Sequence, residues 1–196
     1  MNPRFYIKKP TLLMVVGVAG SGKTVLAHHL AKSLHNSAFL SKDLIQDCFT
    51  KTERVGGNTY SMIRGPTFNL LVNFADIQLS HGKTPVIEGP FSRNFRLKDA
   101  YADWASYFRK VAEKHEARFA IIRCKAPSKK ELKKRLKARN YPWDKDKLDN
   151  WKEWLLQEPE DFPIPHDDIY EAITNKPVDE LSKEVIVNYL KGELID

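Results

Sequence analysis

Hydrophobic positions along the chain follow two spacings that alternate. Short apolar runs, which are typical of buried strands, occur at residues 12–16, 37–41, 85–88, 118–124 and 169–173. Apolar residues spaced three and four apart predict amphipathic helices over 24–35, 67–80, 97–114, 128–139, 144–157 and 178–190. Strands that alternate with helices favour an α/β fold with a five-stranded parallel sheet, in one domain over residues 1–196.

Some local signals refine this pattern. The run 12–16 is apolar at every position, as expected for a central strand that is covered on both faces. Ser128 followed by Glu131 predicts a capping box at the start of the helix over 128–139. Residues 50–65 contain two adjacent glycines and little periodicity, so we expect a loop or irregular segment there.

The first strand leads into Gly17-Val18-Ala19-Gly20-Ser21-Gly22-Lys23-Thr24, which matches the pattern G-x-x-x-x-G-K-[ST] in full. Glycines let successive N–H groups turn toward phosphate oxygens, and the N-terminus of the following helix faces the same anion. We expect Lys23 to neutralise the β- and γ-phosphates and the Thr24 hydroxyl to bind Mg²⁺. The motif predicts a nucleoside triphosphate ligand, but it does not separate a kinase from a GTPase or a motor ATPase.

Two carboxylates follow the second and third strands. Ligands of doubly wound sheets bind beyond the carboxyl ends of the strands, so Asp43 is a candidate to accept the proton of an attacking hydroxyl. Its alternative role is a helix N-cap, while Asp47, one turn further, is expected to be solvated. Glu88 ends the third strand and is a candidate for the Mg²⁺ side or the acceptor side of the site. A buried structural acid paired with a base is its alternative.

Arg135 and Arg139 lie four residues apart and therefore share a helix face. A helix that carries them can close over phosphates as a lid, which excludes water and stabilises charge on the transferring group. We expect this lid within residues 125–143. The alternative is a solvated basic face, which is the expected fate of the lysines on the same helix. Arg93 and Arg96 are candidates either to grip an anionic acceptor or to lie at the surface.

Composition and charge narrow the class of protein. With 42% hydrophobic and 29% charged residues, the chain is not expected to be disordered. The net charge of +7 comprises +9 over residues 1–124, +7 over 125–139 and −9 over 140–196. This distribution indicates an anionic partner, and we explain the basic segment first by a lid over ATP and second by a nucleic-acid surface.

Cysteine content and hydropathy bear on the compartment. Two cysteines, Cys48 and Cys124, are too few for a disulfide framework or a four-cysteine zinc site, and we expect buried or half-buried free thiols. No stretch approaches the roughly 18 apolar residues of a membrane span. We therefore expect a cytoplasmic protein with no membrane partner.

The combination of motifs resembles the P-loop kinases of the nucleoside-monophosphate-kinase-like group, which includes zeta-toxin-like and polynucleotide-kinase-like AAA-domain proteins. The resemblance rests on residues 17–24, 41–43, 82–88, 121–127 and 135–140. It implies a three-layer P-loop NTPase fold with strand order 2-3-1-4-5, a short basic helical lid, and ATP with Mg²⁺. By the same resemblance, Asp43 is the base, and Arg135 and Arg139 are the lid arginines.

The sequence also departs from this family pattern. Gln46 stands where related polynucleotide kinases carry an arginine, and Glu88 stands where aspartate is more usual. Both departures bear on the acceptor, for which the sequence carries no signature.

We therefore expect an ATP-dependent kinase that transfers the γ-phosphoryl group of Mg-ATP to a hydroxyl of a small molecule or nucleotide. The alternatives are a polynucleotide 5′-hydroxyl kinase, and a non-kinase P-loop ATPase or nucleotide-binding regulatory module. The absence of an N-K-x-D motif, which Asn175-Lys176-Pro177 does not supply, argues against a guanine-nucleotide switch.

Overall fold

A parallel sheet forms the centre of the computed structural model, which describes residues 4–50, 57–91, 104–141 and 144–195. Its strands are β2 (Thr11–Val16), β3 (Ser37–Ser41), β4 (Thr84–Gly89), β5 (Arg118–Lys125) and β6 (Ile169–Ile173). They lie in the order β3-β4-β2-β5-β6, and every neighbouring pair is parallel. Numbered by appearance in the chain, this is the order 2-3-1-4-5, so the expected fold class is confirmed.

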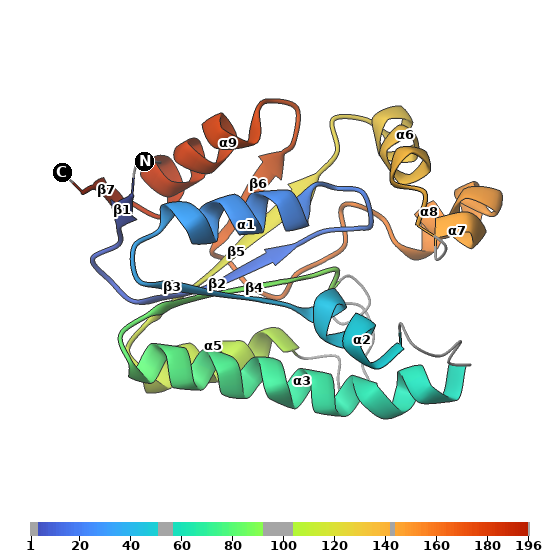
Figure 1. Ribbon diagram of the computed structural model, residues 1–196. Coiled ribbons are helices and arrows are strands. Elements are labelled where there is room, and N and C mark those ends of the chain that lie inside the picture. The colour runs from blue at the N-terminus through green and yellow to red at the C-terminus, as the bar shows by residue number, and fades with distance from the viewer. Residues whose placement is uncertain (1–3, 51–56, 92–103, 142–143, 196) are drawn as a thin grey trace.

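Helices cover both faces of the sheet and give three layers (Figure 1). One face carries α1 (Lys23–Ser33) and α9 (Val178–Glu184), which continues as a π-helical turn over Val185–Tyr189. The other face carries α3 (Gly57–Ser80) and α5 (Trp104–Lys114). Each face has its own apolar core, so the central strand β2 is buried at every position, as its continuous apolar run predicts.

The two ends of the sheet are built differently. Beyond the carboxyl ends of the strands lie α2 (Lys42–Thr50), α6 (Lys129–Arg139), α7 (Lys145–Asp149) and α8 (Trp151–Gln157) (Figure 1). At the opposite end the termini meet, because β1 (Phe5–Tyr6) pairs antiparallel with β7 (Glu193–Leu194). No element of the sequence pattern predicted that small second sheet.

Two helix predictions are wrong in part: one helix begins earlier than expected, and another is divided into two. Residues 57–65, expected to be irregular, form the first turns of α3, which extend beyond the sheet beneath α2 (Figure 1). Met62 in these turns is 73% exposed, so this part of the helix does not bury the apolar residue that the sequence offers there. The helix expected over 144–157 is interrupted at Asn150, whose backbone leaves the helical region with φ −104° and ψ 39°.

One predicted helix cap is partly confirmed, and other predictions concern residues outside the described ranges. Ser128 caps α6, because its hydroxyl accepts the N–H of Glu131 at 3.1 Å, but the Glu131 carboxylate bonds Arg135 in place of closing the capping box. Residues 97–103 of the helix expected over 97–114, together with Arg93 and Arg96, lie outside the described residues. None of the helices in the described part of the chain is both long enough and apolar enough to span a bilayer.

Candidate active site

The phosphate loop, residues 17–24, joins the end of β2 to the start of α1. Gly20 and Gly22 adopt φ values of 82° and 90°, a left-handed region that other residues occupy only with strain. A Cβ at Gly20 would approach side-chain carbons of Leu132 and Leu136 to 3.1 and 3.2 Å, so α6 is packed directly on the loop. The sequence-predicted loop therefore adopts a glycine-dependent turn, and α6 covers it on one side.

A carboxylate, an amine and two hydroxyls meet beside this loop. Strand register makes Ser41 and Glu88 cross-strand partners, and the Ser41 hydroxyl donates to Glu88 Oε2 at 2.6 Å. The Thr24 hydroxyl donates to Glu88 Oε1 at 3.1 Å, and Lys23 Nζ lies 3.7 Å from the same oxygen. Lys23 and Glu88 are both buried. Glu88 is thus a buried acid paired with a base, as its structural alternative expects, and it also contacts the hydroxyl of Thr24, for which Mg²⁺ binding is predicted.

Asp43 lies in the first turn of α2, just beyond the carboxyl end of β3. The helix is capped by Ser41, whose hydroxyl accepts the N–H of Leu44 at 3.3 Å, so Asp43 is not needed as the cap. Among the described residues, none hydrogen-bonds the Asp43 carboxylate, which is exposed. The geometry leaves this carboxylate accessible to an incoming hydroxyl.

The side chain of Lys42, the neighbour of Asp43, packs across Gly89 and bonds Gln46. Its stem crosses Gly89, where a Cβ would come within 2.9 Å of Lys42 Cβ, and its Nζ donates to Gln46 Oε1 at 3.2 Å. Gln46 therefore receives a neighbouring lysine at the place where related polynucleotide kinases carry an arginine. This buried pair is a feature of α2 that the sequence did not reveal.

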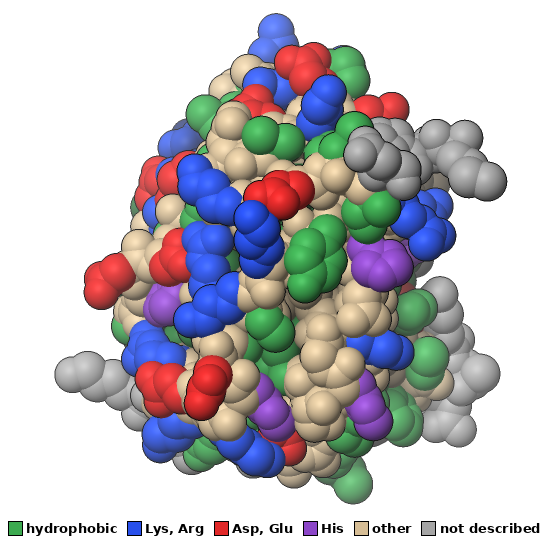
Figure 2. Space-filling view, turned by 90° about the vertical axis from the view of Figure 1, so that its left-hand side faces the viewer, with side chains coloured by type: hydrophobic (Ala, Val, Ile, Leu, Met, Phe, Trp, Pro, Cys, Tyr) green, Lys and Arg blue, Asp and Glu red, His purple; other side chains and the backbone are tan. Residues whose placement is uncertain are grey.

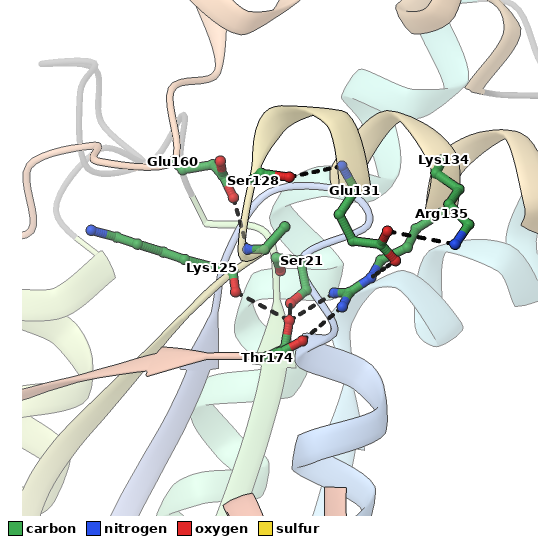
Figure 3. A network of polar contacts seen from close by, with 9 residues as sticks. Ser21, Lys125, Ser128, Glu131, Lys134, Arg135, Glu160 and Thr174 are labelled. Atoms are coloured by element: carbon green, nitrogen blue, oxygen red, sulfur yellow. Dashed lines mark hydrogen bonds and ion pairs between the residues drawn. The ribbon is translucent and has the colours of Figure 1, made fainter. Parts of the chain in front are cut away.

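The two arginines predicted for a lid, Arg135 and Arg139, have different partners. Arg135 donates from Nη1 to the Thr174 hydroxyl and from Nη2 to the Thr174 carbonyl, both at 2.7 Å, and its Nε lies 3.3 Å from Glu131 (Figure 3). Arg139 binds the buried carboxylate of Asp144. Burial acts to raise the pKa of Asp144, but hydrogen bonds from Arg139 and Lys147 outweigh it and lower that pKa. Both arginines are on α6 and each is bonded within the protein, but only Arg135 lies beside the loop, where it shares a pocket wall with Gly22.

An apolar cluster holds α6, the helix predicted to act as a lid. Leu132 and Leu136 pack with Val18 of the phosphate loop, Ala126 after β5 and Trp154 of α8, all of which are buried. Tyr141, just past α6, donates its hydroxyl to Asp47 of α2 at 2.8 Å. The expectation that Asp47 is simply solvated is therefore wrong: it links α2 to the end of the lid helix.

A cavity opens next to the phosphate loop, between α1 and the segment after β6. Its volume is about 240 Å³, and Gly22, Val25, Arg135, Thr174 and Lys176 contribute to its wall. A second, more open hollow of about 480 Å³ adjoins it and shares Arg135 and Thr174. Pockets of this size and mixed lining accept parts of small ligands, and this one lies beside the loop predicted to hold phosphates.

Cysteine placement is mixed. Cys124 is buried, and burial raises the pKa of its thiol to about 12. Cys48 is exposed, so the expectation of two shielded thiols is wrong for this residue. Its place on a solvent-facing side of α2 accounts for the exposure.

Solved structures share the fold over nearly the whole chain. A protein from Chloroflexus aurantiacus proposed to be a kinase has a TM-score of 0.68 at 20% identity, with 94% of this chain and 98% of that chain covered. A sugar kinase from Janibacter sp. HTCC2649 has 0.58 at 19%, with 93% and 95% covered. The APS kinase of Mycobacterium tuberculosis, solved with AMPPNP and APS, has 0.56 at 16%, with 93% and 98% covered.

Sequence comparison places the chain in a family. No curated protein matches it at a significant level. The model of the AAA_33 family, described as an AAA domain, matches residues 12–159, a span that contains the phosphate loop, Asp43, Glu88 and both lid arginines. The chain therefore belongs to this AAA-domain family, and its fold is that of the P-loop kinases.

Proposed function

We propose that the protein is an ATP-dependent kinase that transfers the γ-phosphoryl group to a hydroxyl of a small molecule or nucleotide. The observation that carries the proposal is the cluster of Lys23, Thr24 and Glu88 beside the phosphate loop, with the accessible carboxylate of Asp43 two residues beyond Ser41, which itself binds Glu88. The kinase folds among the solved structures support it.

Each residue of the cluster has a role in the proposed transfer. The loop N–H groups and Lys23 bind the β- and γ-phosphates. The acceptor oxygen forms a bond to the γ-phosphorus while the bond from that phosphorus to the β–γ bridging oxygen breaks. Asp43 takes the proton of the acceptor hydroxyl, and the leaving electron pair stays on ADP.

The donor atoms present suit magnesium. Thr24 and Glu88 bring two oxygens within 3.1 Å of each other, and oxygen ligands are those that Mg²⁺ prefers. Among the described residues, no group of three or more His, Cys, Asp or Glu side chains forms a metal cage. Bound through Thr24 and Glu88 together with the phosphates, Mg²⁺ would neutralise charge that develops on the phosphate oxygens.

Residues 125–143 serve as the lid in this proposal. Arg135 and Arg139 are bonded to Thr174 and Asp144, so contact with the transferring phosphate requires each guanidinium to share or exchange its partner. Asp144 would keep Lys147, which lies 2.8 Å away, when Arg139 turns to the phosphate. Closure over the phosphates would keep water away from the γ-phosphorus.

The test is label transfer from γ-labelled ATP with Mg²⁺ to a panel of nucleosides, sugars, aminoglycoside-like compounds and 5′-hydroxyl oligonucleotides. At least one acceptor should become labelled, and Asp43→Asn should lower its rate about 100- to 1,000-fold because the base is lost. Asp167→Asn, which changes an exposed carboxylate at the opposite end of β6, is the matched control. Label that goes to water alone, at equal rates in wild type and Asp43→Asn, would identify a non-kinase ATPase.

A polynucleotide 5′-hydroxyl is the second candidate acceptor. Exposed lysines on α6 adjoin the proposed site and favour it: Lys129, Lys130, Lys134 and Lys137. Binding of a 5′-hydroxyl oligonucleotide should then weaken steeply between 50 and 200 mM salt, because phosphate contacts release counterions. A binding constant that does not change with salt would remove this candidate.

A further inference from the structure

Thr174, the first residue after β6, holds three segments together with one side chain. Its hydroxyl oxygen lies 2.9 Å from the Ser21 carbonyl of the phosphate loop and 3.1 Å from the Lys125 carbonyl at the end of β5. The same oxygen accepts from Arg135 Nη1 at 2.7 Å (Figure 3). A hydroxyl has one proton and two lone pairs, so it accepts from the guanidinium and shares its single proton between the two carbonyls, of which Ser21 is the nearer.

The bond to Ser21 fixes the direction of a phosphate-loop donor. A trans peptide is planar, so its C=O and the N–H of the next residue point in opposite directions. When Thr174 holds the Ser21 carbonyl on one side, the N–H of Gly22 must point to the other side of the loop. Gly22 has φ 90°, and a Cβ there would lie 3.0 Å from Thr174 Cγ2, so Thr174 also packs closely against this residue.

The backbone of Thr174 anchors the root of the lid. Its N–H donates to the Lys125 carbonyl at 2.9 Å, and its carbonyl accepts from Arg135 Nη2 at 2.7 Å. The lid segment leaves the sheet at Lys125, and Arg135 stands two turns into α6. Thr174 therefore contacts the loop, the point where the lid departs, and the guanidinium that the lid carries.

We propose that Thr174 is a positioning residue that couples the phosphate loop to the lid helix. Its hydroxyl sets the Ser21–Gly22 peptide for phosphate binding and holds Arg135 at the cavity beside the loop. The inference rests on the proposed function, because it takes a nucleoside triphosphate as the ligand of the loop. It adds a residue that acts through others and does not itself touch the phosphates.

Nucleotide affinity of full-length variants tests the role of the hydroxyl. Titration of AMPPNP with Mg²⁺ should give a dissociation constant at least 10-fold weaker for Thr174→Val, which keeps the shape and loses the hydroxyl. Thr174→Ser, which restores the hydroxyl, should stay within about threefold of wild type. Thr11→Val is the matched control, since Thr11 is a buried hydroxyl with one carbonyl partner at the start of β2, far from the loop.

Thermal unfolding of each variant separates a folding defect from a positioning defect. The proposal is overturned if Thr174→Val binds as tightly as wild type, or if Thr174→Ser is as weak as Thr174→Val while both melt cooperatively. Absence of AMPPNP binding by the wild type would overturn the proposed function itself, and this outcome is distinct because it does not depend on residue 174.

A double-mutant cycle tests the coupling. Arg135→Met removes the guanidinium and keeps the length of the stem. If Thr174 acts on nucleotide binding partly through Arg135, the losses of affinity in Thr174→Val and Arg135→Met should not multiply in the double variant. Losses that multiply within experimental error would show that the two residues act independently, and the coupling would be refuted.

Discussion

An arginine binds a residue next to each end of strand β6, and the two arginines bind chemically different partners. Before the strand, Arg118 binds Asp168 through two parallel hydrogen bonds, at 2.6 and 2.8 Å. After the strand, Arg135 binds Thr174 through two bonds at 2.7 Å. The geometry is similar, but the first partner is a carboxylate and the second is a neutral hydroxyl and carbonyl.

At the amino end of β6, the carboxylate of Asp168 neutralises the charge of Arg118. The Tyr189 ring lies 4.5 Å from the Arg118 guanidinium carbon, and its hydroxyl donates to the Asp168 carbonyl at 2.8 Å. The hydrogen bonds from Arg118 lower the pKa of the Asp168 carboxyl, against the opposing effect of burial. Figure 2 views the molecule from this end, where basic and acidic side chains lie side by side.

At the carboxyl end the positive charge is only partly matched. Among the described residues, Glu131 at 3.3 Å is the nearest carboxylate to Arg135, and Thr174 supplies no charge. An anion in the adjoining cavity would complete the electrostatic balance of this arginine. The contrast teaches that Arg135, which binds Thr174 through neutral oxygens, keeps positive charge that a ligand can use, whereas the charge of Arg118 is neutralised by Asp168. Arg139 stands between the two, because its carboxylate partner Asp144 also holds Lys147 and can release the arginine without losing every cation.

The largest expected effect lies at the carboxyl end. Lys23→Ala removes the charge that the phosphates are proposed to meet, so label transfer from ATP should fall about 100- to 1,000-fold. The variant should still fold, because Glu88 keeps its bonds from Ser41 and Thr24. Circular dichroism checks the fold, and transfer at the wild-type rate would contradict the assignment of the loop.

The comparison is tested directly by the same substitution at both arginines. Arg135→Lys should lower label transfer about 10- to 100-fold and leave the melting temperature nearly unchanged, because the forked contact is lost where a ligand is expected. Arg118→Lys should do the reverse, lowering the free energy of unfolding by about 1–2 kcal/mol with unchanged transfer at 25 °C. If both variants lose stability and neither loses activity, the Arg118 and Arg135 contacts are equivalent, and the proposed difference between them is refuted.

The smallest effect is a pH dependence at the amino end. Since the folded-state pKa of Asp168 is lowered, its pairing stabilises the protein above the unfolded-state value of about 4, and this stabilisation is lost as pH falls through the folded-state pKa. Asp168→Asn should therefore cost about 1–2 kcal/mol at pH 7 and progressively less in acid. Urea unfolding across this pH range measures the difference. A constant difference between the two proteins would contradict the pairing.

The sequence could predict what is encoded locally. The phosphate loop, the strands over 37–41 and 169–173 and the cap at Ser128 depend on neighbours a few residues apart, and the structure has them where the pattern placed them. Strand order followed from the family resemblance and is confirmed as well.

Contacts between distant segments could not be found in the same way. Thr174 meets Ser21 across 153 positions and Tyr141 meets Asp47 across 94, and neither pair belongs to a motif. Thr174 carried one faint signal, its place directly after a parallel strand, where ligands of such sheets gather. The catalytic roles of Asp43, Arg135 and Arg139 stay predictions.

The close approach of Gly20 to α6 limits which substitutions this chain can accept at position 20. Position 20 is one of the four variable places in the phosphate-loop pattern, yet here a Cβ would lie only 3.1 Å from Leu132 and 3.2 Å from Leu136, and the backbone is left-handed. A larger residue at position 20 therefore requires the leucine side chains to shift, or smaller residues at 132 or 136. In a library that randomises positions 20, 132 and 136 together, folded variants should show covariation of residue size among the three positions. The helix α6 would then restrict which residues the phosphate loop can carry.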